Sequence, residues 1–170
     1  MTSSRAVLSG ALAAVALLAS ACGTTGAAPE GELPARVDGA RQDASVARLD
    51  PDLRSAVRAA MRAAREDGVR VEITSGWRSR EHQQRLYDEA VARYGSEDEA
   101  RRYVATPDSS AHVTGDAVDL GPTDALSWLS QHGADFGLCQ TFANEMWHYE
   151  LATTPGGRCP EMLLDGTGRS

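Results

Sequence analysis

The sequence contains no lysine, so all 17 of its basic residues are arginines. This absence excludes a Schiff-base lysine and a Ser–Lys dyad, because both kinds of nucleophilic site need a lysine amine. The arginines are scattered among aspartates and glutamates, and the formal net charge is −7. A nucleic-acid-binding surface needs a stripe or patch of positive charge, so we expect no nucleic-acid partner.

Aromatic residues are also scarce, at 5% of the 170 residues, and the chain contains neither a GxGxxG sequence nor a phosphate-binding loop. No internal repeat is visible. Hydrophobic residues make up 42% of the chain, a share typical of a globular protein, and the length fits one modest domain. We therefore expect a monomer with a single core.

The N-terminal residues are typical of an export signal. Arg5 is followed by an apolar run over 6–18, which is too short to be a stable membrane anchor. The sequence LASAC, which ends at Cys22, resembles the lipobox of bacterial lipoproteins, although Ala19 stands where that pattern prefers leucine. We predict a lipoprotein-type signal over 1–21 and a lipid on Cys22 that holds the protein outside the cytoplasm at a bacterial membrane. Ordinary secretion with cleavage near Cys22 is the alternative.

The remaining chain is expected to divide into three parts. Residues 22–45 are rich in Gly, Ala, Thr, Pro and acidic residues without periodicity, which is typical of a flexible tether. Residues 46–160 form the folded domain, and residues 161–170 form a C-terminal tail. Once Cys22 is set aside, Cys139 and Cys159 remain, and two cysteines in an exported chain usually pair. We predict a disulfide between them; two buried free thiols are the alternative.

Hydrophobic periodicity predicts an α+β fold in a single domain, with a small antiparallel or mixed sheet flanked by helices. Helices and strands are interspersed, but they do not alternate regularly as in a parallel α/β protein. The expected elements are, in order, helix 51–67, strand 69–74, helix 80–94, a short helix from 97, strand 117–120, helix 123–131 and strand 146–151.

One mid-chain stretch, SSAHVTGDAVDL, pairs His112 with Asp119. In the expected strand, Asp119 lies on the face opposite to the apolar layer. The segment is half-buried, so a carboxylate that points into the protein from this face needs a partner that offsets its desolvation. The interval of seven residues would put the two side chains on opposite faces of a continuous strand. Gly115 is able to supply a bend through a positive φ. A metal ion is one candidate partner, and a simple hydrogen-bonded pair is the other.

A second stretch, EMWHYE, contributes His148. If its strand neighbours that of Asp119, two imidazoles and one carboxylate form a three-ligand zinc site whose fourth position is open, which is the catalytic pattern. Glu145 and Glu150 both flank His148 and could take a proton from water. Spacing alone does not choose between them, although strand alternation leans slightly to Glu150.

Three ordered motifs resemble those of the zinc D-alanyl-D-alanine peptidases, a family that includes VanY-like carboxypeptidases and VanX-like dipeptidases. They are SxHxxGxAxD over 110–119, ExxH over 145–148, and SGWRS over 75–79, in which Trp replaces the usual Tyr. The resemblance implies that zinc lies on the sheet and is bound by His112, Asp119 and His148. It also implies that Glu145 is the general base and that Arg78 stabilises the oxyanion, so we choose Glu145 over Glu150.

The resemblance implies removal of the terminal D-Ala from peptidoglycan stem peptides by a zinc-dependent carboxypeptidase. Ser110 and Gln83 are candidates for contacting that substrate, although a serine in a polar loop is more often only a turn residue. The alternatives are a D-Ala-D-Ala dipeptidase, an L,D- or D,D-endopeptidase, and a non-catalytic, zinc-containing wall-binding module. The predicted export signal argues against the dipeptidase, because that enzyme normally works in the cytoplasm.

Overall fold

The structure is a computed structural model that describes residues 44–169. The predicted signal, Cys22 and nearly all of the predicted tether therefore lie outside the described residues. Within the described part of the chain, no helix has the length and apolar character needed to cross a membrane.

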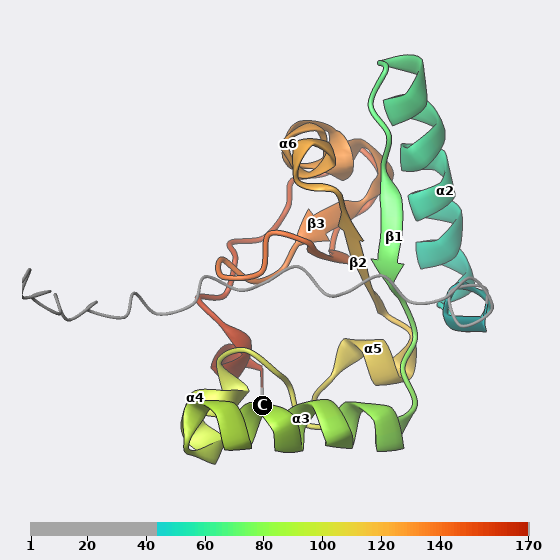
Figure 1. The fold of residues 1–170 in the computed structure, drawn as a ribbon. Helices are drawn as coiled ribbons and strands as arrows, with labels where there is room; N and C mark the ends of the chain where they lie inside the picture. Colours follow the sequence, from blue (N-terminus) through green and yellow to red (C-terminus); the bar gives the residue numbers. More distant parts are fainter. Residues whose placement is uncertain (1–43, 170) are drawn as a thin grey trace, which may run out of the picture.

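Four antiparallel strands form the sheet at the centre of the fold (Figure 1). They are β1 (Glu72–Ser75), β2 (Ala117–Gly121), β3 (Leu138–Gln140) and β4 (His148–Leu151), in the spatial order β1-β2-β4-β3. The two central strands, β2 and β4, come from the two stretches whose histidines the sequence analysis singled out. The expected α+β fold with a small antiparallel sheet is confirmed.

Two helices and the sheet enclose the main core. Helix α2 (Pro51–Glu66) begins at Asp50, whose carboxylate accepts hydrogen bonds from the first-turn amides, and proline occupies its first position. Helix α6 (Thr123–His132) follows β2 directly. The fully buried side chains that these helices share with the sheet are Leu53, Val57, Val118, Leu120, Leu129, Leu138 and Tyr149.

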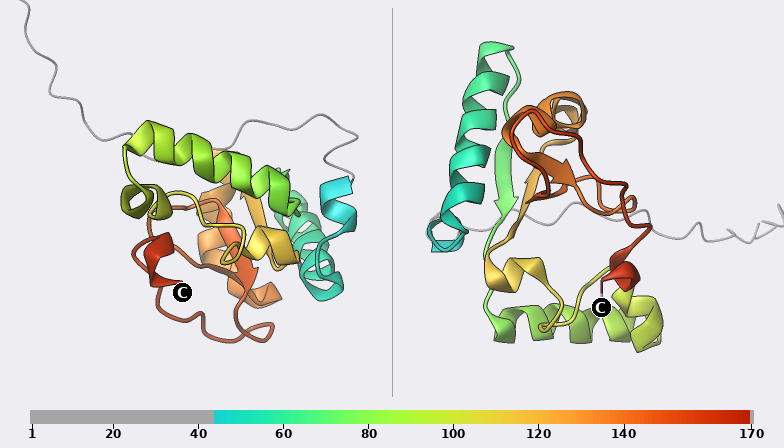
Figure 2. Two further views of the ribbon diagram at one scale, coloured as in Figure 1. Left: turned by 90° about the horizontal axis from the view of Figure 1, so that it is seen from below. Right: turned by 180° about the vertical axis from the view of Figure 1, so that it is seen from behind.

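Three helices lie beyond one end of the sheet, on the side away from α6 (Figures 1 and 2). They are α3 (Arg80–Tyr94), α4 (Glu97–Arg101) and α5 (Ala111–Thr114). The hydroxyl of Ser79 caps α3, and the positive φ of Gly95 ends it. Helices α3 and α4 share a second, smaller apolar cluster, so this part of the fold carries its own packing.

Local structure departs from the sequence prediction in two places that matter for the site. The residues before Gly115 form the single helical turn α5, whereas no element was predicted there. Strand β4 begins at His148 and not at Met146, because a turn precedes it in which the His148 amide donates to the Glu145 carbonyl at 3.1 Å. Strand β3 and the 3-10 turns η1 (Gly133–Phe136) and η2 (Gly166–Gly168) were also not predicted.

The predicted disulfide between Cys139 and Cys159 is confirmed, with Cα atoms 5.7 Å apart. It joins β3 to the segment that follows β4. The bond therefore closes a loop that contains Glu145 and the whole of β4.

We expect that replacing Cys139 and Cys159 together by alanine lowers the free energy of unfolding by about 3 kcal/mol, because the loop is no longer closed in the unfolded chain. Urea unfolding of the two proteins at equal concentration measures the difference. An unchanged unfolding midpoint would show that the bond contributes nothing to stability.

Candidate metal centre and active site

Strand pairing places the first two residues of the site. Asp119 of β2 lies directly opposite His148 of β4 in the register. Side chains alternate between the two faces of a strand, so Val118 and Leu120 enter the main core while Asp119 faces the other way. Asp119 and His148 are 1% and 4% exposed. The sheet therefore buries a carboxylate and an imidazole side by side on the face that points away from α2 and α6.

Helix α5 brings the third residue, His112. Gly115 ends this helix with φ of 90°, and a Cβ at that position would lie 2.6 Å from the Arg48 carbonyl oxygen. Only glycine fits there, because both the backbone conformation and the space exclude a side chain. The turn at Gly115 thus lets the chain reverse between His112 and Asp119, so that the two side chains face each other.

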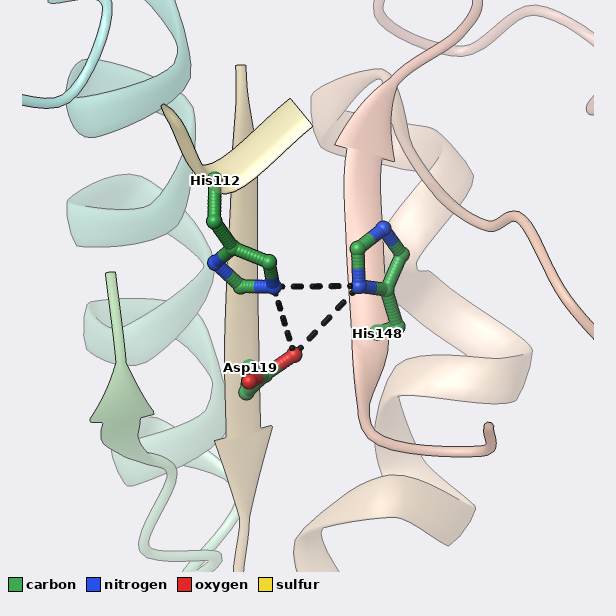
Figure 3. Close-up of side chains that lie close together, drawn as sticks. All are labelled: His112, Asp119 and His148. Atoms are coloured by element: carbon green, nitrogen blue, oxygen red, sulfur yellow. Dashed lines mark hydrogen bonds and ion pairs between the residues drawn. The ribbon is translucent and has the colours of Figure 1, made fainter. Parts of the chain in front are cut away.

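The three side chains point toward one another in Figure 3. His112 Nε2 lies 3.2 Å from Asp119 Oδ1, and His148 Nδ1 lies 3.4 Å from the same oxygen. The two ring nitrogens are 3.3 Å apart. A tetrahedral zinc ion with bonds of about 2.0–2.1 Å holds its ligand atoms about 3.3 Å apart. The triangle therefore has the size of one face of a zinc coordination tetrahedron.

Each imidazole is held so that its second ring nitrogen faces this triangle. His112 donates its Nδ1–H to the Gly76 carbonyl at 2.8 Å, which leaves Nε2 free. His148 donates its Nε2–H to Glu150 Oε1 at 2.8 Å, which leaves Nδ1 free. Such partners on the outer nitrogen fix the tautomer of metal-binding histidines.

The carboxylate of Asp119 is satisfied on one oxygen only. Its Oδ2 accepts a hydrogen bond from Arg78 Nη2 at 2.5 Å, whereas its buried Oδ1 has no hydrogen-bond partner in the described part of the chain. A buried oxygen left in this state is costly. A cation bound between Oδ1 and the two ring nitrogens would remove that cost, so the donor set fits a metal ion.

The charges around the triangle favour a cation. Burial opposes ionisation of Asp119, but His112 and Arg78 hold its pKa well below the usual range. Burial likewise opposes the protonation of His148, but the nearby carboxylates of Asp119 and Glu150 raise its pKa to about 9. Burial and Arg78 lower the pKa of His112. Asp119 is thus an anion beside two imidazoles, which suits a divalent metal.

The two glutamates beside His148 occupy different positions. Glu145 Oε2 lies 3.6 Å from His148 Nδ1, on the side of the triangle, because the turn before β4 brings Glu145 back toward the ring. Burial raises the pKa of Glu145 to about 7. Glu150 contacts the opposite edge of the ring, and although burial opposes it, hydrogen bonds from His148 and Arg169 lower its pKa to about 2. The geometry therefore distinguishes an acid that can exchange a proton from one that stays charged.

Arg78 is fixed at three points. Besides Asp119, its guanidinium donates to Ser75 Oγ at 3.0 Å and to Gln83 Oε1 at 3.4 Å. Gln83 is 1% exposed, and its amide nitrogen donates to the Ala105 carbonyl at 2.8 Å. Both ends of the Gln83 amide thus form hydrogen bonds within the protein, and Gln83 also lines the cavity beside Arg78.

A cavity of about 420 Å³ opens over the triangle. Ser110 lines it and is 5% exposed, and we find no hydrogen bond from its hydroxyl within residues 44–169. Sequence reasoning missed two further residues at this cavity, Phe142 and Arg169. The Phe142 ring lies 5.1 Å from that of His148, and Arg169 donates to Glu150 at 2.7 Å. Neither belongs to a local motif, so only the folded chain places them here.

Comparison with known proteins identifies the family. The model of the VanY family, described as D-alanyl-D-alanine carboxypeptidase, matches residues 46–154. The chain belongs to the VanY family. The match covers most of the described residues and contains all three motifs.

Individual VanY-like proteins are similar over shorter stretches. A D-alanyl-D-alanine carboxypeptidase of Enterococcus faecalis is 33% identical over 112 residues, which cover 51% of this chain and 42% of that protein. This chain thus spans less than half the length of that relative.

Solved structures show the same fold. VanYB in complex with D-Ala-D-Ala is 30% identical, with a TM-score of 0.57 over 60% of this chain and 70% of that one. A mutant of the VanY D,D-pentapeptidase from a VanB-type resistance cassette, in complex with Zn(II), is 29% identical, with a TM-score of 0.56 over 60% and 71%. The L,D-carboxypeptidase DacB of Streptococcus pneumoniae is 30% identical, with a TM-score of 0.51 over 60% of this chain and 65% of that one.

We expect the chain to bind one zinc ion. We expect Asp119→Asn to weaken zinc binding by more than the 10–100-fold typical of an outer partner, because it removes the negative charge of the triangle. Competition with a chromophoric chelator measures the affinity.

The matched control is Asp116→Asn, which changes an exposed acid of the same segment. If both variants bound zinc as the unchanged protein does, the triangle would not be the metal site.

Proposed function

We propose that this VanY-family protein is a zinc-dependent D-alanyl-D-alanine carboxypeptidase that removes the terminal D-Ala from peptidoglycan stem peptides. The observation that carries the proposal is the meeting of His112, Asp119 and His148 at the spacing of zinc ligands, with Glu145 beside them. Two VanY relatives support it, because one structure holds Zn(II) and another holds D-Ala-D-Ala.

In this proposal His112, Asp119 and His148 hold the zinc ion. A zinc ion with three protein ligands supplies Lewis acidity, which lets water attack a carbonyl near neutral pH. Glu145 lies on the metal side of His148 and accepts the proton of the attacking water. It then delivers that proton to the amine that leaves as D-Ala. General acid–base catalysis of this kind contributes roughly 10²–10⁴-fold in rate.

Arg78 stabilises the negative oxygen that develops as the amide carbonyl is attacked. Its contacts with Ser75, Asp119 and Gln83 use three of the five guanidinium N–H groups, so about two are left for a substrate oxygen. Its side chain is 16% exposed and lines the cavity, and its position is fixed in advance. Preorganised donors of this kind contribute about 10²–10³-fold. Ser110, which lines the same cavity, hydrogen-bonds to the peptide through its hydroxyl.

The substrate also fits the predicted location. A lipid on Cys22 and a tether over 22–45 would hold a monomeric domain outside the membrane, where peptidoglycan is found. A second candidate is cleavage of an L,D bond, which the likeness to the L,D-carboxypeptidase DacB favours.

Product analysis tests the proposed reaction. We expect the zinc-loaded protein to convert a stem pentapeptide into the tetrapeptide plus one D-Ala, with little turnover of free D-Ala-D-Ala, and mass spectrometry identifies the products. Preference for the free dipeptide would replace the proposal by a dipeptidase. Cleavage of the tetrapeptide alone would replace it by the L,D activity, and zinc binding without any hydrolysis would favour a wall-binding module.

We expect Glu145→Gln to keep zinc affinity and to lower kcat by about 10²–10⁴-fold, because only the proton acceptor is lost. Glu150→Gln is the matched comparison, since it changes the other glutamate that contacts His148. We expect it to weaken zinc binding by about 10–100-fold and to retain turnover once the site is saturated with zinc. The reverse pattern would assign the base to Glu150.

A further inference from the structure

The last described residues fold back onto the domain, although they lie outside the residues that the VanY family matches. Leu163 forms a parallel bridge with Phe142. The Ala143 amide donates to the Leu163 carbonyl at 2.8 Å, and the Leu163 amide donates to the Thr141 carbonyl at 2.9 Å. These backbone hydrogen bonds attach the segment to the chain that leads from β3 to β4.

A second attachment fixes the same segment to α4. Asp165 accepts from Arg102 Nε at 3.0 Å, and its side chain is 15% exposed. Gly166 packs so closely on the Arg101 carbonyl that a Cβ would lie 2.5 Å from that oxygen. Figures 1 and 2 show the segment around η2 beside α4, at the same end of the molecule as α3. Its course is thus fixed before it reaches Arg169.

Arg169 then enters the site from this segment. Its Nη2 donates to Glu150 Oε2 at 2.7 Å, and its guanidinium carbon lies 5.3 Å from the centre of the Phe142 ring. The other oxygen of Glu150 accepts from His148 Nε2. The side chains of Arg169, Glu150 and His148 are 28%, 14% and 5% exposed, so the hydrogen-bonded series runs from the rim inward to the metal triangle.

We propose that Arg169 is a positioning residue for the metal ligand His148 and that it acts through Glu150. Arg169 holds the Glu150 carboxylate in one orientation, and Glu150 in turn holds the His148 ring with its Nδ1 toward the metal position. The inference rests on the proposed zinc site. It goes beyond the function by making the segment over 163–169 a structural part of that site.

The physical reason lies in the geometry of the two bonds. A carboxylate that orients a metal-binding histidine must keep one oxygen on the ring N–H. Arg169 occupies the other oxygen with a planar, positively charged donor. Without Arg169, the Glu150 side chain would be able to turn toward solvent, and the His148 ring would lose its fixed orientation.

The test measures zinc affinity in the full chain by chelator competition. Arg169→Gln removes the charge but keeps a long side chain near Phe142, and we expect zinc affinity to fall about tenfold, the lower end of the effect of outer partners. Arg169→Lys restores the charge, so we expect it to recover most of the affinity. Arg158→Ala, an exposed arginine in the same C-terminal part of the chain, is the control and should bind zinc as the unchanged protein does.

A double-mutant cycle tests the route through Glu150. If Arg169 acts through that carboxylate, Arg169→Gln has no further effect on zinc affinity in a Glu150→Gln background. The same loss in both backgrounds would overturn the inference. So would unchanged affinity of Arg169→Gln, or a rise in KM alone, which would mean that Arg169 binds substrate. Circular dichroism of each variant shows whether it is folded. If Arg169→Gln is unfolded, Arg169→Lys decides the matter, because a folded Arg169→Lys with low zinc affinity would also overturn the inference.

The outcomes separate this inference from the proposed function. If the unchanged protein binds no zinc, both fail. If it binds zinc but releases no D-Ala, the carboxypeptidase proposal fails. The positioning inference would still be supported if Arg169→Gln lowered the zinc affinity and Arg169→Lys recovered most of it. If it releases D-Ala and the variants bind zinc equally, only the positioning inference fails.

Discussion

The cross-strand pair of Asp119 and His148 is the interaction on which the rest of the site depends. Antiparallel pairing of β2 with β4 puts a carboxylate and an imidazole opposite each other on one face of the sheet. The other face of the same strands carries Val118, Leu120 and Tyr149 into the main core. Hydrophobic burial therefore fixes the register, because a slip by one residue would turn the polar pair into the core and the apolar residues toward the cavity.

Each side chain of the triangle forms a hydrogen bond with an outer partner, and two of these partners are themselves held by a further side chain. The Gly76 carbonyl orients His112, Glu150 orients His148, and Arg78 holds the outer oxygen of Asp119. Arg78 is itself held by Gln83, as Glu150 is by Arg169. Nearly every polar group is thus used on its outer side and faces the triangle on its inner side. Burial of these side chains is tolerable because they are hydrogen-bonded on their outer sides, whereas the Asp119 oxygen that faces the metal position has no hydrogen-bond partner among the described residues.

The sequence predicted those parts of the site that depend on local spacing. The strand around Asp119, the bend at Gly115 and the pairing of two cysteines all follow from short-range rules, and the structure contains each of them. Strand alternation leaned toward Glu150 as the base, because it assumed a strand from Met146 onward. The turn before β4 invalidates that assumption and brings Glu145 to the metal side of the ring. The contacts of Phe142 and Arg169 depend on how distant segments pack, and no local pattern encodes them.

The different surroundings of Glu145 and Glu150 explain how two like residues around one histidine could serve different purposes. Both carboxylates are mostly buried, and burial raises the pKa of each. Glu150 accepts hydrogen bonds from His148 and Arg169, and these outweigh burial. His148 and Arg78 lower the pKa of Glu145 by their charge, but burial prevails and raises it to about 7. The hydrogen bonds that His148 and Arg169 donate to Glu150 therefore separate a fixed anion from a carboxylate that can exchange a proton.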